Sequence, residues 1–284
     1  MSSKKIFLKL FKFIFGALLL FIALYPVYWL IVMAVQPSEA LSDPKLLPHS
    51  LTVMNFIELF TEKNFGRALS NSLLITLVSL AISLIFGLAT SYILARDRFK
   101  NSWKGGLSFW ILLIRILPPV AFTIPLYTMF NKAGILATLH PMILSCILIN
   151  LPLIIWFIMG FFRQLPEEIE ESAMIDGATE AQLYNLIVLP LVMPGVAAVS
   201  MLSFMSAWNE YTYSVVFVQS PQKYTIPLAL AALNSEDTLT NFGLVSAAET
   251  MKDSQYCALV TFKESECVRS ELARAAAERM RDIA

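Results

Sequence analysis

Residues 68–95 read ALSNSLLITLVSLAISLIFGLATSYILA, an unbroken stretch without a charged side chain. A helix needs about 20 mainly apolar residues to cross the hydrocarbon core of a bilayer, because each residue adds 1.5 Å against a thickness of about 30 Å. The stretch is longer than this minimum. We therefore predict that it is a transmembrane helix, with Ser70 and Asn71 available to cap its start.

Four further stretches have the same apolar character. Hydrophobic residues make up 57% of the 284-residue chain and charged residues 15%, against about 25% charged residues in a typical soluble domain. The third span is interrupted by Arg115 and by Pro118 and Pro119, where we expect a kink. The predicted fold class is an all-α, polytopic transmembrane helix bundle with five clear spans. The other four spans are 13–35, 105–131, 141–162 and 187–208.

Basic residues near the span ends predict the orientation. Two clusters flank the first two spans, and the positive-inside rule places both in the cytoplasm. A cleaved signal peptide is disfavoured because no small-residue cleavage site lies near Gln36. The N-terminus and the loop at 163–190 are therefore predicted to be cytoplasmic. The basic clusters are Lys4, Lys5, Lys9 and Lys12, and Arg96, Arg98, Lys100 and Lys104.

Several classes of function are disfavoured by composition and motifs. The chain has 21 basic and 21 acidic residues, so no charge excess indicates a nucleic-acid partner. Its cysteines and histidines lack the spacing typical of metal sites or disulfide frameworks. It has no Walker A phosphate loop and no nucleophile elbow. We expect no catalytic residue, no metal and no cofactor, and we predict that the chain is not an enzyme.

The loop at 163–190 contains clear helix signals. Pro166 followed by acidic residues is typical of a helix start, since acids stabilise the positive end of the helix dipole. Gly177, after Asp176, is predicted to end this helix after about two and a half turns in a left-handed conformation. Thr179 and Gln182 then have the spacing of a capping box at the start of a second helix.

The same loop carries a family resemblance. Residues 171–178 read ESAMIDGA, and IVLP follows at 187–190 after eight residues. This pattern closely resembles the EAA loop of ABC importer permeases, with Ser172 in place of the middle alanine. The resemblance covers about residues 10–250 and is closest to carbohydrate-type permeases, such as those of maltose and glycerol-phosphate uptake. It extends to LPPV at 117–120, IPLY at 124–127, SAWNE at 206–210 and YTIPL at 224–228.

The resemblance implies a function and a set of partners. The chain would be an inner-membrane, multi-pass permease subunit forming the translocation path of an ATP-driven importer for a sugar or a related polyol or oligosaccharide. Its partners would be cytoplasmic ATP-binding subunits that use the ATP, a second permease subunit in a heterodimer, an extracytoplasmic solute-binding protein and membrane lipid. The loop would be a coupling helix that docks on the ATPase through Glu171, Ala173, Asp176, Gly177, Ala178, Ile187, Leu189 and Pro190.

Two groups of residues are candidates for the translocation path. Charges inside a span usually face a bundle interior or an aqueous cavity, although Arg115 could instead snorkel to the interface. At the end of the fifth span, aromatic and polar side chains could contact a sugar, or they could belong to the interface and the outer vestibule. The candidates are Arg115, Pro118, Pro119, Trp208, Asn209 and Glu210.

The C-terminal part departs from the family pattern. A sixth span is expected after about residue 240, but the uncharged runs at 238–248 and 254–262 are too short to cross a bilayer. Glu249, Lys252 and Asp253 lie between them. The expected sixth span is therefore absent or replaced. We hypothesise a shifted reading frame near codons 247–251, leaving a truncated, non-transporting remnant that retains the ATPase-docking loop; the alternative is a genuine five-span variant.

These features divide the chain into four regions. They are a basic cytoplasmic tail at 1–12, a first span with an external loop at 13–67, a permease core at 68–248 that contains the coupling loop, and an atypical charged tail at 249–284.

Overall fold

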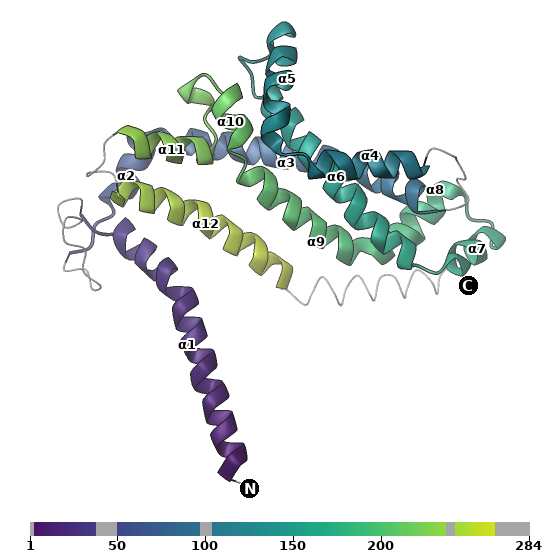
Figure 1. Cartoon of the computed structure of the whole chain (residues 1–284), viewed down its shortest axis with the longest axis horizontal. Helices are drawn as coiled ribbons and strands as arrows, with labels where there is room; N and C mark the ends of the chain where they lie inside the picture. Colours follow the sequence, from purple (N-terminus) through teal and green to yellow (C-terminus); the bar gives the residue numbers. More distant parts are fainter. Residues whose placement is uncertain (1–2, 38–49, 97–103, 237–241, 265–284) are drawn as a thin grey trace. The chain divides into compact units, whose positions relative to one another are not determined.

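A computed structural model describes residues 3–37, 50–96, 104–236 and 242–264, and every regular element in these ranges is a helix (Figure 1). The predicted all-α class is confirmed for this part of the chain. The chain divides into two compact units. The first comprises Met1–Gly66 and Ala229–Ala258, and the second comprises Arg67–Leu228 and Leu259–Ala284.

The first unit is held together around α2. It contains α1 (Ser3–Ala34), α2 (Met54–Thr61), most of α11 (Ile226–Glu236) and most of α12 (Phe242–Glu264). Asn55 Nδ2 donates hydrogen bonds to the carbonyl oxygens of Ala34 and Gln36, both at 2.9 Å. A Cβ on Gly243 would lie 2.7 Å from the same amide nitrogen. The start of α12 and the end of α1 therefore both meet the start of α2.

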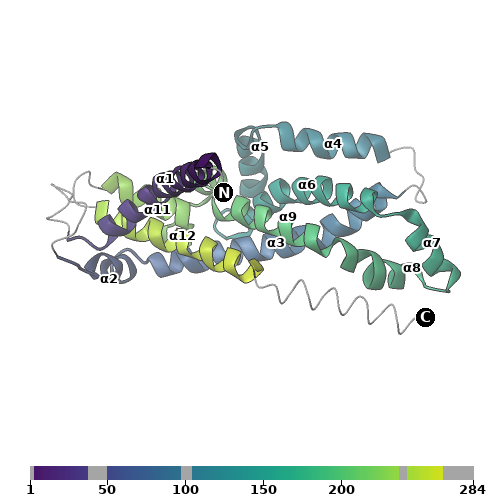
Figure 2. The ribbon, with the colours of Figure 1, turned by 90° about the horizontal axis from the view of Figure 1, so that it is seen from below.

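The core of the second unit lies between α3 (Phe65–Ala95), α6 (His140–Gln164) and α9 (Leu189–Trp208). These three helices lie side by side in both views (Figures 1 and 2). Ile154 and Ile158 of α6 and Val192 of α9 are buried in one apolar cluster with Tyr92 of α3. The remaining elements are α4 (Lys104–Ile116), α5 (Pro119–Lys132), α7 (Glu167–Ile175), α8 (Glu180–Gln182), η3 (Leu183–Val188), α10 (Thr212–Phe217) and η4 (Pro221–Lys223).

The break predicted in the third span is present. The helices α4 and α5 meet at an angle of 98°. Pro119 is the first residue of α5, and Pro118 before it is extended, with ψ 137°. The ring of a proline disfavours helical conformation in the residue that precedes it, so the pair ends α4 and starts a new helix.

Among the described residues, four helices are long and apolar enough to cross a membrane: Phe11–Ala34, Phe65–Ala95, His140–Gln164 and Glu180–Phe217. The number rises to the five predicted spans if the bent pair α4 and α5 is counted as one broken span. One local prediction is wrong. Ser70 and Asn71 do not cap the second span, because α3 already begins at Phe65. Asn71 Nδ2 instead donates to the carbonyl oxygens of Gln222 and Tyr224, both at 3.1 Å.

The region predicted to lack a sixth apolar span is nevertheless helical. One continuous helix, α12, runs through Glu249, Lys252 and Asp253. These charges keep it outside the set of candidate spans found among the described residues. Lys252 Nζ lies 3.3 Å from Glu249 Oε2, one turn away, so two of the charges are paired. The rest of the predicted charged tail, 265–284, lies outside the described residues.

Close packing of α3 against α6 generates a stability prediction. A Cβ on Gly87 would lie 2.6 Å from Ile154 Cγ2, and Ile154 is fully buried and β-branched, so it has little freedom to move. We expect Gly87→Ala to lower the free energy of unfolding by about 1–3 kcal/mol. Thermal unfolding of the purified protein in detergent would measure the change.

Gly160→Ala is the matched control. Gly160 also lies within a helix, α6, but nothing lies within 4 Å of its Cβ position. Alanine should raise stability there by up to about 1 kcal/mol through helix propensity. Equal effects of the two substitutions would contradict the close contact at Gly87.

Candidate functional site

The loop after α6 begins with a turn at Leu165 and Pro166. Leu165 is extended, with ψ 128°, as expected for a residue before a proline. The helix α7 starts at Glu167 with acids in its first turn. The predicted helix start is confirmed, but Pro166 occupies the N-cap and not the first helical position. The loop lies at one end of the second unit (Figure 1).

Gly177 ends α7 as predicted. Its φ is +88°, in the left-handed region that favours glycine. The amide of Ala178 donates to the Ala173 carbonyl at 3.0 Å, and the amide of Gly177 donates to the Met174 carbonyl at 3.1 Å. This pair of bonds is a Schellman motif. The turn is therefore fixed by backbone hydrogen bonds.

The predicted capping box is also confirmed. Thr179 Oγ1 accepts from the Gln182 amide at 3.4 Å, and the Thr179 amide donates to Gln182 Oε1 at 2.9 Å. The short helix α8 continues into η3, a π-helical segment, and then into α9. The loop thus consists of two capped helices joined by a tight turn, and its second helix leads directly into a span.

The helix α7 has a buried face and an exposed face. Glu170 and Ala173, one turn apart, are buried. Glu171 lies on the exposed face, with Met174 41% and Ile175 86% exposed. The outward face of α7 is therefore mixed, with both acidic and apolar side chains exposed.

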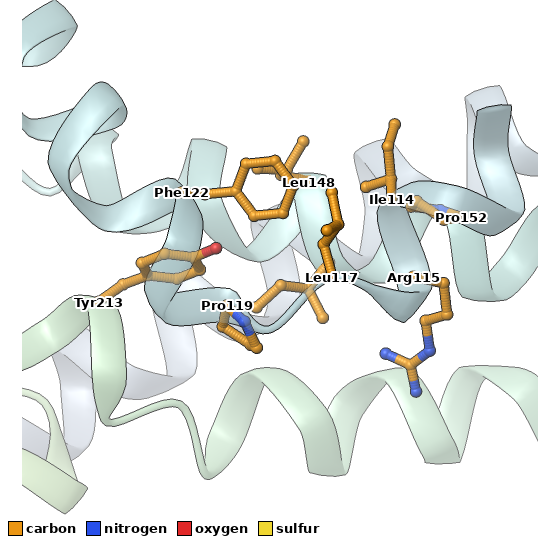
Figure 3. Close-up of a pocket in the computed structure, with 9 residues that line it drawn as sticks. Ile114, Arg115, Leu117, Pro119, Phe122, Leu148, Pro152 and Tyr213 are labelled. Atoms are coloured by element: carbon orange, nitrogen blue, oxygen red, sulfur yellow. The ribbon is translucent and has the colours of Figure 1, made fainter.

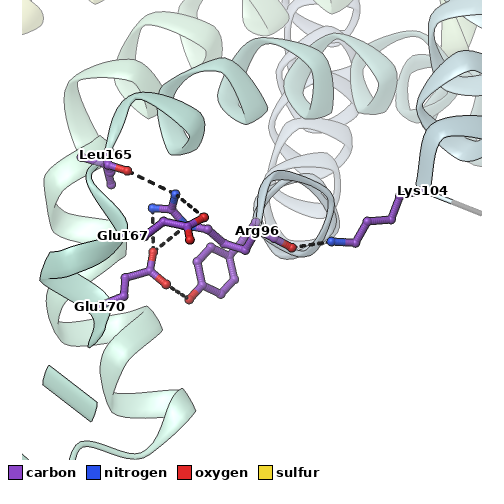
Figure 4. A network of polar contacts seen from close by, with 6 residues as sticks. Arg96, Lys104, Leu165, Glu167 and Glu170 are labelled. Atoms are coloured by element: carbon purple, nitrogen blue, oxygen red, sulfur yellow. Dashed lines mark hydrogen bonds and ion pairs between the residues drawn. The ribbon is translucent and has the colours of Figure 1, made fainter. Parts of the chain in front are cut away.

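A buried ion pair ties α7 to the end of α3 (Figure 4). Arg96 directly follows α3 and is 3% exposed, and Glu170 is 4% exposed. Arg96 Nε donates to Glu170 Oε1 at 2.6 Å, and Tyr92 Oη donates to Glu170 Oε2 at 2.9 Å. Both carboxylate oxygens therefore have a partner. Arg96 Nη1 also donates to the Leu165 carbonyl at 3.2 Å.

The residues predicted for the coupling loop fall into two groups. Glu171, Asp176 and Gly177 are exposed. Four of the other five belong to or pack against the buried core around Ile154 and Ile158, and the fifth, Pro190, lies in the first turn of α9. Ser172, the departure from the family pattern, donates its hydroxyl to the Glu168 carbonyl at 2.7 Å, so the helix accommodates it. The second group comprises Ala173, Ala178, Ile187, Leu189 and Pro190.

Sequence reasoning missed Arg96, Tyr92 and Glu170. The sequence indicates Arg96 only as one of the basic residues that predict the orientation, and Glu170 only as one of the acids in the loop at 163–190. A signal was available for Glu170, because it lies three residues before Ala173 and so shares its helix face. No local pattern indicates that Arg96 meets it, since the two are 74 positions apart.

Arg115 lines a cavity beside the break between α4 and α5 (Figure 3). The cavity holds about 90 Å³ and is mainly apolar, and Pro119 and Tyr213 also line it. Arg115 is exposed in the isolated chain. Within the described ranges, no group of three or more His, Cys, Asp or Glu side chains is placed to hold a metal ion.

The candidate residues at the end of α9 do not share one environment. Trp208 is 1% exposed, and its ring stacks on Phe204 with centroids 5.4 Å apart. Asn209 is exposed and donates to the Met205 carbonyl at 3.0 Å. Glu210 Oε1 accepts from the Tyr213 amide at 2.9 Å, at the start of α10. In this structure both polar side chains bind to helix ends.

Comparison with known proteins matches residues 87–251 to the family described as the binding-protein-dependent transport system inner membrane component. The diacetylchitobiose uptake system permease protein DasC of Streptomyces coelicolor is 34% identical over 238 residues, covering 83% of this chain and 85% of that protein. The trehalose transport system permease protein SugB of Mycobacterium tuberculosis is 32% identical over 209 residues, covering 74% and 76%.

A solved structure has a similar fold. It is a chain of a bacterial ABC transporter involved in the import of the acidic polysaccharide alginate, which superposes with a TM-score of 0.76. The match covers 93% of this chain and 99% of that chain at 19% identity.

Gly177 provides a test of the loop geometry. Nothing lies within 4 Å of its Cβ position, so a substitution there acts through the backbone alone. We expect Gly177→Ala to weaken the turn by about 1–2 kcal/mol, because the left-handed conformation is unfavourable for alanine. Gly177→Asn should cost less, since asparagine tolerates that conformation better. Hydrogen exchange of the amides of α7 and α8 would measure both, and equal effects would contradict a left-handed Gly177.

Proposed function

This chain belongs to the family of binding-protein-dependent transport system inner membrane components, and from that membership we propose that it is the permease subunit of an ATP-driven sugar importer. It forms part of the translocation path and has no hydrolytic role of its own. The substrate is a sugar or a related polyol or oligosaccharide. Support for this class comes from the relatives named for diacetylchitobiose and trehalose.

The exposed face of α7 is the observation that carries the coupling role. Glu171 and Ile175 face outward from a helix that is capped at its end by a Schellman motif and held at Glu170 by a buried ion pair. A rigid element of this kind transmits movement better than an unstructured loop would. We assign this face to the contact with a cytoplasmic ATP-binding subunit, which hydrolyses the ATP.

The proposal includes the further partners of such an importer. A second permease subunit completes the path as a heterodimer, and a solute-binding protein delivers the substrate from outside. The described residues contain four apolar helices and one bent pair, in keeping with a multi-pass protein of the inner membrane. The basic clusters favour a cytoplasmic N-terminus, which places α7 on the same side as the ATPase.

Arg115, Pro118 and Pro119 are proposed to lie beside the translocation path. The cavity at the α4–α5 break supports this placement, because a broken helix is tolerated in a membrane where it lines a cavity or packs on protein. Trp208 is buried against Phe204, so we assign it a packing role at the end of α9. Asn209 and Glu210 would reach substrate only after releasing the helix ends that they bind in this structure.

Charge changes on the exposed face of α7, or in the glycine turn that follows it, should uncouple transport. We expect Glu171→Lys to reverse a charge at the ATPase contact, and Gly177→Asp to add one while straining the turn. Either should reduce uptake at least about tenfold, the scale of losing one charged interface contact, while the protein stays in the membrane. Uptake of radiolabelled sugar by cells, with immunoblotting of the membrane fraction, would measure this.

Glu62→Lys is the control for charge reversal. Glu62 is an exposed acid just after α2, in the loop predicted to be external. Its reversal should leave uptake near that of the unaltered protein. Unchanged uptake in both α7 variants would contradict the docking role of α7.

A non-transporting remnant is the second candidate, and α12 is the observation that favours it. This helix carries Glu249, Lys252 and Asp253 where the family pattern requires an apolar span. The test is to read the gene across codons 240–284 in all three frames. A second frame with about 20 apolar residues would support a frame shift, and its absence would favour a genuine variant with a charged final helix.

A further inference from the structure

Arg96 is the point where three elements distant in sequence meet. It follows α3 directly and forms an ion pair with Glu170 of α7, 74 positions away. Its carbonyl accepts a hydrogen bond from Lys104 Nζ, at the first residue of α4. The covalent chain connects α7 only to α6 and α8. The ion pair therefore adds a direct connection between α7 and α3, a span that is distant from α7 in the sequence.

The geometry of this link fixes orientation as well as distance. Arg96 Nε and Nη2 both lie 2.6 Å from Glu170 Oε1, while Nη1 reaches the Leu165 carbonyl. The guanidinium is planar, so contacts on two of its edges orient its plane between the end of α6 and α7. Tyr92 Oη holds the second carboxylate oxygen from the preceding turn of α3. Rotation of α7 relative to α3 would break several of these contacts at once.

Burial makes the arrangement costly to disrupt but a poor source of net stability. Both side chains are at least 95% buried, and a buried ion pair is often no more stabilising than an apolar pair of the same size. Removing one partner, however, leaves an uncompensated charge. A pair of this kind is therefore suited to specify one arrangement of two elements.

We propose that Arg96 is the positioning residue of the coupling loop, and that its ion pair with Glu170 makes α3 move together with α7 when the ATPase contact moves. This inference rests on the proposed function for its mechanical meaning. The existence of the link is independent of it. Neither residue is part of the exposed face of α7, so the two roles are separable by mutation.

The first test needs no partner protein. In the purified full-length chain in nanodiscs, Arg96→Gln and Glu170→Gln should each raise hydrogen exchange of the α7 amides at least about tenfold. Arg96→Gln leaves the buried Glu170 carboxylate without its cation, and Glu170→Gln leaves Arg96, among the described acids, with only the exposed Glu167, whose Oε1 lies 4.0 Å from Nη1. The amides of the middle of α6 should keep their exchange rates. Arg96→Lys should lie between, since lysine keeps the charge but loses the bridging geometry.

The double variant separates a pair from two independent defects. Arg96→Gln combined with Glu170→Gln should raise exchange by less than the product of the two single effects, because neither charge is then left unpaired. Glu168→Gln is the control, an exposed acid of the same helix, and it should leave exchange unchanged. Unchanged α7 exchange in both single variants, or purely multiplicative effects in the double variant, would overturn the proposed link.

The second test measures coupling in the assembled importer. In proteoliposomes with the ATPase, partner permease and binding protein, Arg96→Gln should lower sugar uptake per ATP hydrolysed at least about tenfold, the order expected for lost coupling between sites. The amount of assembled complex should stay unchanged, and Arg96→Lys should partly restore the ratio. An unchanged ratio would overturn the positioning role. If the unaltered chain shows no ATP-dependent uptake, the proposed function fails, and the exchange measurement still decides whether the link exists.

Discussion

Hydrocarbon offers no hydrogen-bond partner to a peptide group, and this constraint governs most of what the chain can do. Every N–H and C=O within the bilayer must be satisfied by the protein itself, which explains why the apolar stretches are helices. It also explains why interruptions are informative. The break at Pro118 and Pro119 occurs beside a cavity between packed helices. The backbone is irregular there because neighbouring elements and the cavity provide an environment that lipid would not.

The charged side chains where α7 meets the end of α3 lie in two kinds of environment, buried and exposed. Arg96 belongs to the basic cluster from which a cytoplasmic N-terminus is predicted, yet its side chain is buried and paired with Glu170. One residue thus combines a topological signal with a structural contact. The acids of α7 also divide by position, since Glu170 faces inward and Glu171 faces outward. The short helix α7 therefore has a buried and an exposed acidic side chain, and only part of the loop's surplus of acids is accessible.

Local signals were sufficient for the helices and the turn of the site, and insufficient for its tertiary contacts. Gly177 and the pair Thr179 and Gln182 were predictable because each acts within a few residues of itself. The start of α3 was misjudged because polar residues at Ser70 and Asn71 resemble a cap, whereas Asn71 binds a segment about 150 positions away. The contact between Arg96 and Glu170 also joins residues far apart in the sequence, so no local pattern predicts it. The length of α12 is not predicted either, because Glu249, Lys252 and Asp253 interrupt the apolar pattern that indicates a span but not the helix itself.

The π-helical segment at Leu183–Val188 has a geometric consequence for the evolution of the loop. A π turn accommodates one residue more than an α turn, and each α-helical residue turns the chain by about 100°. Deleting one residue from this segment would convert it to regular α-helix and leave the rotation of α8 about the axis of α9 nearly unchanged, because the wide turn already accommodates the extra residue. The same deletion from a regular part of α9 would rotate the preceding elements by roughly 100°. A single-residue gap in a family alignment should therefore be tolerated within this segment more readily than within the regular helix that follows it.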